Sequence, residues 1–236
     1  MDTIIKILDL TKRYGKHTAL DGVTLQLPKG HIVGLLGPNG SGKTTLLKLC
    51  AGILTPNSGT VEIDGKKVGP ETKALVSYLP DRTYLTSRQK IRQQLDFFQD
   101  FYADFDRPRA EQMLASLGIH PDTRFGTLSK GNQEKVQLVL VMSRRAKLYL
   151  LDEPIGGVDP AARDYILNTI VANYDPEATV LISTHLISDV ENILDGFIFL
   201  HNGHVVRSGI ADQAREESGM TLDELFREVF RCLPNS

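Results

Sequence analysis

The stretch Gly37-Pro-Asn-Gly-Ser-Gly-Lys-Thr44 decides the fold of this chain. An apolar run (31–36) precedes it and a helix-forming run (45–51) follows it, so we expect a strand, a glycine turn and a helix in that order. Glycines let successive backbone N–H groups curl around an anion, and the N-terminus of the helix adds partial positive charge. This order of elements predicts a loop that binds phosphate groups.

The same loop carries side chains suited to a nucleoside triphosphate. Lys43 can reach the β- and γ-phosphates, and the Thr44 hydroxyl can ligate Mg²⁺. The residues expected around the phosphates are Gly37, Pro38, Asn39, Gly40, Ser41, Gly42, Lys43, Thr44 and Thr45. With glycine at about 7% of average composition, an accidental match has a probability on the order of one in a hundred. We therefore expect the protein to bind a nucleoside triphosphate with Mg²⁺.

Length, charge and cysteine content narrow the class of protein. A chain of 236 residues can bury a full core, either as one large α/β domain or as a core domain with an appended subdomain. The formal net charge of −2 argues against a dedicated nucleic-acid surface. Cys50 and Cys232 fit no metal spacing, which favours reduced, buried thiols in a cytosolic protein.

Residues 3–10 resemble a strand rather than a secretory signal, and the apolar stretches fall short of the ~18 residues that span a bilayer. We expect any membrane spans to come from another chain.

Hydrophobic periodicity divides the chain into segments of different character. Alternating runs at 4–10, 20–27, 60–65 and 74–79 predict strands, whereas strand signals vanish between residues 86 and 146 and helical periodicity replaces them. Further on, expected strands (148–151, 179–183, 197–200) alternate with expected helices (160–174, 186–194), which is typical of a mainly parallel sheet. A capping box at 221–224 opens a last helix. We expect one α/β domain with an N-terminal antiparallel β subdomain: a nucleotide-binding core (1–85 and 147–209), a helical insert (86–146) and a helical tail (210–236).

Aromatic residues mark one face of the helical segment. Phe97, Phe98, Phe101, Tyr102 and Phe105 recur at i, i+3 and i+4 spacing. Our first interpretation is that they fill the core of the helical subdomain. The other interpretation is a docking groove for a partner helix, and the two can hold for different faces.

The apolar run Leu148-Tyr-Leu-Leu-Asp-Glu153 predicts a strand that ends in two carboxylates. Alone, such a pair usually belongs to a turn or a helix cap. A phosphate-loop enzyme, however, needs an acid at the carboxyl edge of its sheet to hold Mg²⁺. In such enzymes the acid often holds the ion through a water molecule, and we expect Asp152 to have this role. We expect Glu153 to orient or deprotonate the attacking water.

Further motifs, in the right order, resemble those of the ATP-binding cassette (ABC) family. Leu128-Ser-Lys-Gly-Asn132 resembles its signature sequence, Tyr78-Leu-Pro-Asp81 its Q-loop, Gly157-Val-Asp159 its D-loop and Ser183-Thr-His185 its switch-histidine segment. Tyr14 resembles the aromatic residue that stacks on adenine. The resemblance implies a RecA-like P-loop NTPase core that hydrolyses ATP with Lys43, Glu153 and His185 as catalytic residues. Unlike His185, the histidines at 201 and 204 receive no role at the site: they flank Asn202-Gly203, which is a type I′ turn signal.

The resemblance also implies a second cassette, identical or not. Ser129, Gly131 and Asn132 would face a nucleotide held by the phosphate loop of that second chain, with Asp159 close by. One chain has one phosphate loop and one signature, so two chains meet head to tail around two ATP molecules. Closing and opening of this dimer would then be the mechanical output.

The chain departs from the family pattern at a few positions. Asp81 stands where the family has glutamine; it can approach Mg²⁺ through water but cannot donate an amide hydrogen bond. Lys130 and Asn132 replace a glycine and a glutamine of the commonest signature, and Gly157 replaces a small hydroxyl residue. Because Lys43, Thr44, Asp152, Glu153 and His185 are all present, we expect an active ATPase.

The leading functional hypothesis is the ATPase subunit of a membrane transporter, with a separate permease. The signature and the short tail resemble bacterial exporter cassettes more than importer cassettes, and the location implied is the cytoplasmic face of the plasma membrane. One alternative is a soluble cassette that acts on nucleic acid or ribosomes. Another is a nucleotide-sensing module without turnover, which the Asp152-Glu153 pair disfavours.

Overall fold

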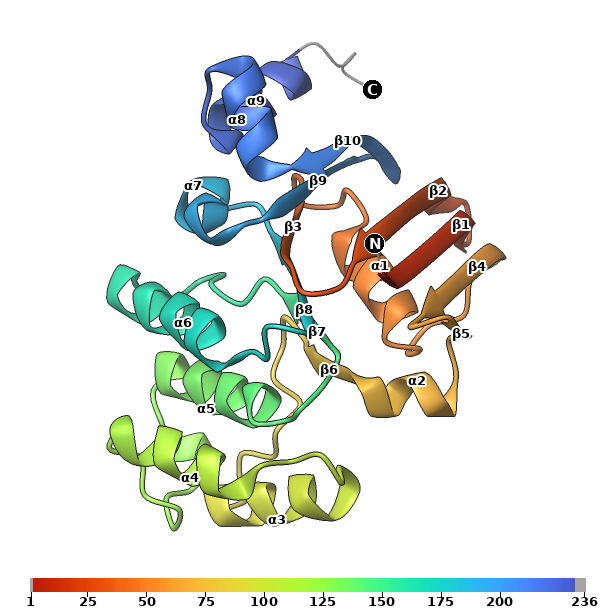
Figure 1. The fold of residues 1–236 in the computed structure, drawn as a ribbon. Helices are drawn as coiled ribbons and strands as arrows, with labels where there is room; N and C mark the ends of the chain where they lie inside the picture. Colours follow the sequence, from red (N-terminus) through yellow and green to blue (C-terminus); the bar gives the residue numbers. More distant parts are fainter. Residues whose placement is uncertain (1, 232–236) are drawn as a thin grey trace.

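The computed structural model describes residues 2–231, except for the side chain of Ala161; Cys232 and residues 233–236 of the expected tail lie outside the described residues. Two sheets and a group of helices make up the molecule (Figure 1). The smaller sheet has the strand order β2-β1-β4-β5, and the larger has the order β10-β9-β3-β8-β7-β6. The chain therefore contains both the antiparallel and the mainly parallel layers that its sequence predicts.

The antiparallel sheet comprises β1 (Thr3–Tyr14), β2 (His17–Pro28), β4 (Ser58–Ile63) and β5 (Lys66–Lys67). Ile7 of β1 pairs with Leu25 on one side and with Val61 on the other. All three are buried, together with Ile5 and Ile63. One face of this sheet thus supplies apolar surface for the rest of the molecule, as the alternating pattern requires.

The core sheet places its parallel strands in the middle. It comprises β3 (Ile32–Leu36), β6 (Val76–Leu79), β7 (Leu148–Asp152), β8 (Thr179–Thr184), β9 (Gly196–His201) and β10 (His204–Ile210). β3, β7 and β8 are buried along their whole length, because both faces of the sheet are covered. α1 (Lys43–Cys50) and the antiparallel sheet pack on one face, and α5–α9 pack on the other.

Two predicted elements differ from the structure in the type of secondary structure over part of their length. Ala74 and Leu75 belong to α2 (Pro70–Leu75), so the strand predicted from residue 74 begins only at Val76. Pro70 starts this helix, and the Gly69 N–H donates to the Thr72 hydroxyl at 2.9 Å. The helix predicted at 186–194 is a single turn, α7 (Ile187–Val190), followed by the 3₁₀ turn η2 (Glu191–Ile193).

The helical segment consists of α3 (Ile91–Phe101), α4 (Arg107–Ser116), the 3₁₀ turn η1 (Phe125–Thr127) and α5 (Lys130–Met142). Its aromatic stripe divides between two environments. Phe98 is buried and lies 5.4 and 5.5 Å from the rings of Tyr102 and Phe105, so the core interpretation is correct for these three. Phe97 and Phe101 are 50% and 70% exposed, with ring centroids 4.4 Å apart.

A buried arginine joins the helical segment to the core sheet. The Arg144 guanidinium bonds both carboxylate oxygens of Asp104, at 3.0 and 3.1 Å. It also donates to the carbonyls of Val76 and Ala74, at 2.6 and 2.8 Å, and lies 3.9 Å from the centroid of the Tyr102 ring. Because this cation is paired and hydrogen-bonded on all sides, it fixes the start of β6 against the helices.

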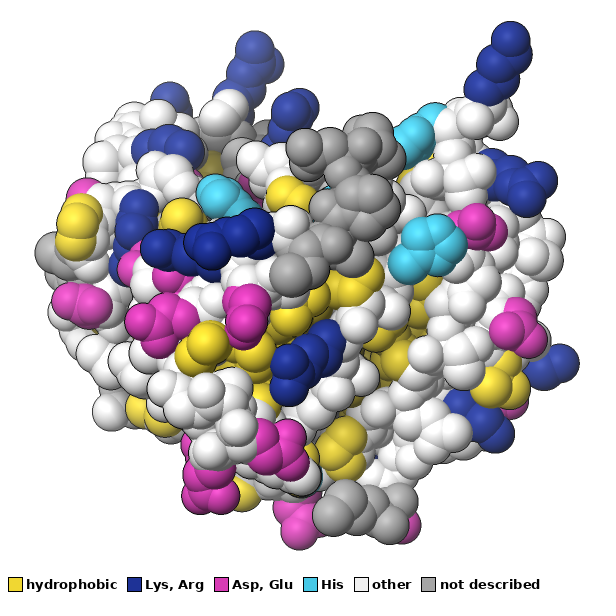
Figure 2. Space-filling view, turned by 90° about the horizontal axis from the view of Figure 1, so that it is seen from above, with side chains coloured by type: hydrophobic (Ala, Val, Ile, Leu, Met, Phe, Trp, Pro, Cys, Tyr) yellow, Lys and Arg dark blue, Asp and Glu magenta, His cyan; other side chains and the backbone are white. Residues whose placement is uncertain are grey.

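The C-terminal part forms α6 (Pro160–Asn173), α8 (Ala211–Ser218) and α9 (Leu222–Arg231). The capping box is confirmed: Thr221 N donates to Glu224 Oε2 at 2.9 Å, and Glu224 N donates to Thr221 Oγ1 at 3.1 Å. Asn202 and Gly203 both have positive φ (46° and 80°), as the predicted turn requires. On the face seen in Figure 2, basic and acidic side chains are interspersed.

Cys50 is buried within α1, and burial raises the pKa of its thiol to about 12, so this cysteine is the inert thiol expected. Within residues 2–231, none of the helices has both the length and the apolar character needed to cross a bilayer.

Candidate functional site

The phosphate loop lies between β3 and α1, at the carboxyl edge of the core sheet. Gly42 adopts φ 108°, and a Cβ there would lie 2.5 Å from the Ala19 carbonyl oxygen. A side chain at Gly37 would collide with the Leu200 carbonyl. Only glycine fits at both positions, because the loop passes closely by these two carbonyls, and this packing fixes the path of the loop backbone.

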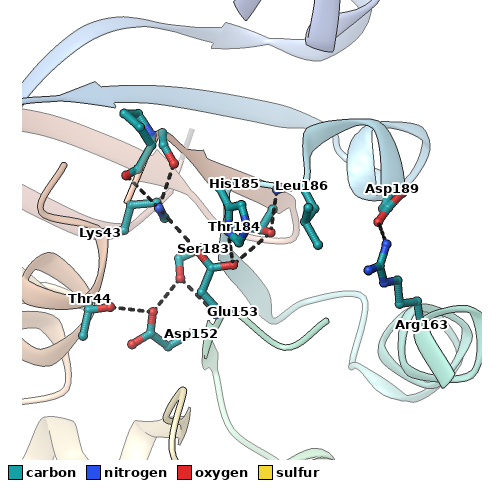
Figure 3. Close-up of polar contacts among 12 residues, drawn as sticks. Lys43, Thr44, Asp152, Glu153, Arg163, Ser183, Thr184, His185, Leu186 and Asp189 are labelled. Atoms are coloured by element: carbon teal, nitrogen blue, oxygen red, sulfur yellow. Dashed lines mark hydrogen bonds and ion pairs between the residues drawn. The ribbon is translucent and has the colours of Figure 1, made fainter. Parts of the chain in front are cut away.

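Lys43 points back over the loop rather than into solvent. Its ammonium donates to the carbonyls of Gly37 and Pro38, at 2.7 and 3.1 Å, and lies 3.3 Å from Glu153 Oε1 (Figure 3). Lys43 is almost fully buried, so this charge is desolvated before any ligand arrives. A phosphate that enters the loop finds a preorganised cation there.

Asp152 ends β7 and is held by two hydroxyls. Thr44 Oγ1 donates to its Oδ1 at 3.0 Å, and Ser183 Oγ donates to the same oxygen at 2.7 Å. Burial raises the pKa of Asp152; the hydroxyl bonds oppose this shift, and the charges of Asp81 and Glu153 reinforce it. Since extra positive charge would favour the ionised form, these oxygens suit a divalent cation.

Glu153 connects the phosphate loop to the segment that ends β8. Its Oε2 accepts from Thr184 Oγ1 at 3.1 Å and lies 3.0 Å from His185 Nδ1, while Oε1 faces Lys43. The backbone of Glu153 has φ 48°, a left-handed conformation that costs a non-glycine residue on the order of 1–3 kcal/mol. Such strain is typical of residues whose side chain must point in one functional direction.

Many of the predicted residues line one cavity of about 580 Å³, whereas Gly37, Pro38, Ser41 and Asp152 are not part of its lining. Its lining includes Tyr14, Asn39, Gly40, Gly42, Lys43, Thr44, Thr45, Asp81, Glu153, Gly157 and His185. Tyr14 is about half exposed, so part of its ring surface is accessible to a planar ligand. His17 and Ala19 also line the cavity, although neither is among the residues predicted from the sequence. Both lie in β2 directly after the turn that follows Tyr14, and this position is the signal that could have found them.

The signature residues lie outside this cavity lining. Ser129 caps α5 by accepting from Asn132 N at 3.3 Å, and Asp159 caps α6 by accepting from Ala162 N at 3.0 Å. Gly131 faces Asp159: a Cβ on Gly131 would lie 4.0 Å from Asp159 Oδ2. The structure therefore brings Ser129, Gly131, Asn132 and Asp159 together as a second group, at the starts of two neighbouring helices.

Comparison with known proteins identifies the family. A sequence model described as "ABC transporter" matches residues 20–156. The ABC-type transporter ATP-binding protein EcsA of Bacillus subtilis is 29% identical over 96% of both chains. The daunorubicin resistance ATP-binding protein DrrA3 of Streptomyces coeruleorubidus is 30% identical over 97% of this chain and 75% of its own length.

Similarity of structure agrees with that of sequence. The solved structure of an ATP-binding subunit of an ABC transporter superposes with a TM-score of 0.86 at 31% identity, over 97% of this chain and all of that one. This confirms the predicted fold, a mainly parallel core with an antiparallel N-terminal sheet and a helical insert. The chain therefore belongs to the ABC transporter family, as an ATP-binding subunit whose ATP hydrolysis is coupled to transport.

Proposed function

We propose that this chain powers an exporter: two copies close around two Mg·ATP and drive a separate permease at the cytoplasmic face of the membrane. The division of the site into two groups carries this proposal. Lys43, Glu153 and His185 share one cavity, whereas Ser129 and Gly131 stand at a helix start outside its lining. A second copy can supply the group that each cavity lacks, which gives an isologous dimer.

Each residue of the cavity has a role in this proposal. Tyr14 stacks on adenine, the loop N–H groups and Lys43 bind the phosphates, and His185 contacts the γ-phosphate. Thr44 and Asp152 would hold Mg²⁺, since their oxygens already lie 3.0 Å apart and are the hard ligands that this ion prefers. The bound ion would neutralise charge that develops on the phosphates.

Hydrolysis requires that the Lys43–Glu153 pair opens. The γ-phosphate competes for the ammonium that now lies 3.3 Å from Glu153. Once released, the Glu153 carboxylate can accept a proton from the attacking water while Thr184 and His185 keep it oriented. Nucleotide binding thereby frees the Glu153 carboxylate to act as the general base.

The transport direction is supported by the relatives and the signature. One relative is named for daunorubicin resistance, and Leu-Ser-Lys-Gly at 128–131 resembles exporter signatures. The test is an ATPase assay of the chain alone and with its membrane partner reconstituted in lipid vesicles. A transport motor should be stimulated by the permease; stimulation by ribosomes or nucleic acid instead would overturn the proposal.

The surface for the permease is a groove of about 630 Å³ between the core and the helical segment. Ile53, Tyr84 and Phe97 contribute exposed apolar surface to it, and its lining also includes three basic residues, Lys48, Lys73 and Arg82. An apolar groove with basic residues fits a short amphipathic helix that carries acidic side chains. We therefore propose a cytoplasmic helix of the permease with this chemistry as its occupant.

Phe97→Ser should weaken permease binding about tenfold or more, because burying such a side chain contributes ~1.5–3 kcal/mol. The measurement is permease-stimulated ATPase activity as a function of subunit concentration. Val171→Ser is the matched control, since Val171 is an exposed apolar residue on α6 rather than in the groove. Equal behaviour of the two variants would rule out the groove as the docking surface.

Asp81→Gln tests the departure at the Q-loop position. Asp81 lines the cavity and its charge acts on Asp152, so we propose that it binds the Mg²⁺ through water. Losing this outer ligand should raise the Mg²⁺ concentration for half-maximal activity ~10-fold. A magnesium titration of the variant measures this, with Asp164→Gln on the exposed side of α6 as control. An unchanged Mg²⁺ dependence would show that Asp81 plays no ligand role.

A further inference from the structure

One arginine joins the loop after β7 to the short helix after β8. Arg163, on α6, places Nη1 2.6 Å from Asp189 Oδ2 on α7. Its Nε donates to the carbonyl of Val158 at 3.2 Å. Figure 3 shows this pair apart from the Lys43–Glu153–His185 cluster, so Arg163 itself does not touch the reacting groups. A single guanidinium thus bridges two separate segments.

Both bridged segments lead directly to Glu153. Val158 belongs to residues 156–159, which begin three residues beyond Glu153, and Gly156 N donates to the Glu153 carbonyl at 2.9 Å. α7 begins two residues beyond His185, and Leu186 N donates to the same Thr184 hydroxyl that bonds Glu153. Displacing either segment therefore displaces a group that holds the Glu153 side chain or its backbone.

α7 depends on its surroundings for its position. It has only four residues and no side-chain hydrogen bond at its N-cap, and an isolated helix of this length is not stable in water. Ile187 and Val190 are buried and fix one face of the turn. Arg163 holds the turn from α6 through Asp189, and this pair is about 30% exposed on each side, so its geometry can change without opening the core.

We propose that Arg163 is a positioning residue that aligns His185 with the γ-phosphate when residues 156–159 contact the second copy. This rests on the proposed function, in which that segment meets the second copy. When residues 156–159 contact the second copy, the position of the Val158 carbonyl is fixed, and with it the position of the Arg163 guanidinium. Through its contact with Asp189, Arg163 then fixes the position of α7 and of the adjoining His185. Hydrolysis is thereby linked to dimer closure rather than to ATP binding alone.

Arg163→Ala should lower kcat ~10- to 100-fold, the scale expected when a catalytic group is misplaced by about 1 Å, and leave the KM for ATP within about twofold. Steady-state phosphate release measures both constants. Asp189→Asn should give the same result, and the double variant should be no worse than either single one. Arg107→Ala is the matched control: it breaks an Arg–Asp contact that is also 2.6 Å long, from an arginine of similar exposure (28% against 29%).

A His185→Ala background separates positioning from a purely structural role. If Arg163 acts through His185, its replacement should have no further effect on the residual rate in that background. An undiminished effect there, or a loss in Arg163→Ala no larger than in Arg107→Ala, overturns the proposal. ATP-driven dimerisation of a Glu153→Gln chain tests the proposed function separately, because Arg163 is intact in that variant.

Discussion

Glu153→Gln should reduce ATP turnover by ~10²–10⁴-fold, the contribution typical of a general base. Glutamine has nearly the same shape and can still accept the hydrogen bond from Thr184, but its amide cannot take a proton from water. The change also removes the negative charge 3.3 Å from the Lys43 ammonium. ATP binding should therefore be retained or tightened while hydrolysis stops, and the chain should accumulate as an ATP-bound dimer.

Two measurements check this expectation. Phosphate release gives the turnover, and light scattering of the chain with saturating Mg·ATP gives the mass in solution. Glu111→Gln is the matched control, because the Glu111 carboxylate pairs with Arg107, 2.8 Å away on α4, rather than with Lys43. Wild-type turnover in Glu153→Gln would show that another group acts as the base.

Local sequence predicted the elements that carry the phosphate loop because each depends on near neighbours. Residues 31–36 are apolar throughout and form β3 under two covering layers, and glycines at 37 and 42 fit a backbone that passes other carbonyls closely. Strand lengths were harder to predict. β1 runs to Tyr14 rather than ending at Leu10, because irregularities around Asp9, where φ is 47°, let pairing continue beyond a break in the alternation.

The site was predicted as a set of residues but not as a set of contacts. Asp152 and Ser183 meet because β7 pairs with β8 in that register, a long-range choice that no local pattern encodes. The same pairing brings Glu153 beside Thr184 and His185, and the Lys43–Glu153 ion pair follows from it. No local pattern in the sequence predicts that Glu153 and Lys43 form an ion pair with each other.

Mixing two inactive variants should restore activity if each site combines parts of two chains. Lys43→Met removes the cation that binds the phosphates but keeps a long side chain, so its homodimer has two defective sites. Ser129→Asp keeps an N-cap residue for α5, which Ser129 now caps, and adds negative charge where a phosphate must approach. In a mixed dimer one site carries both defects and the other carries neither.

The recovered rate has an upper limit set by pairing. Random exchange of equal amounts makes half of the dimers mixed, each with one intact site of two, so up to about a quarter of the wild-type rate per chain should return. Mixing Lys43→Met with Glu153→Gln is the control, because these residues contact each other within one chain and every mixed site stays defective. Recovery in the control, or none with Ser129→Asp, would mean that the signature helix does not complete the site of a second copy.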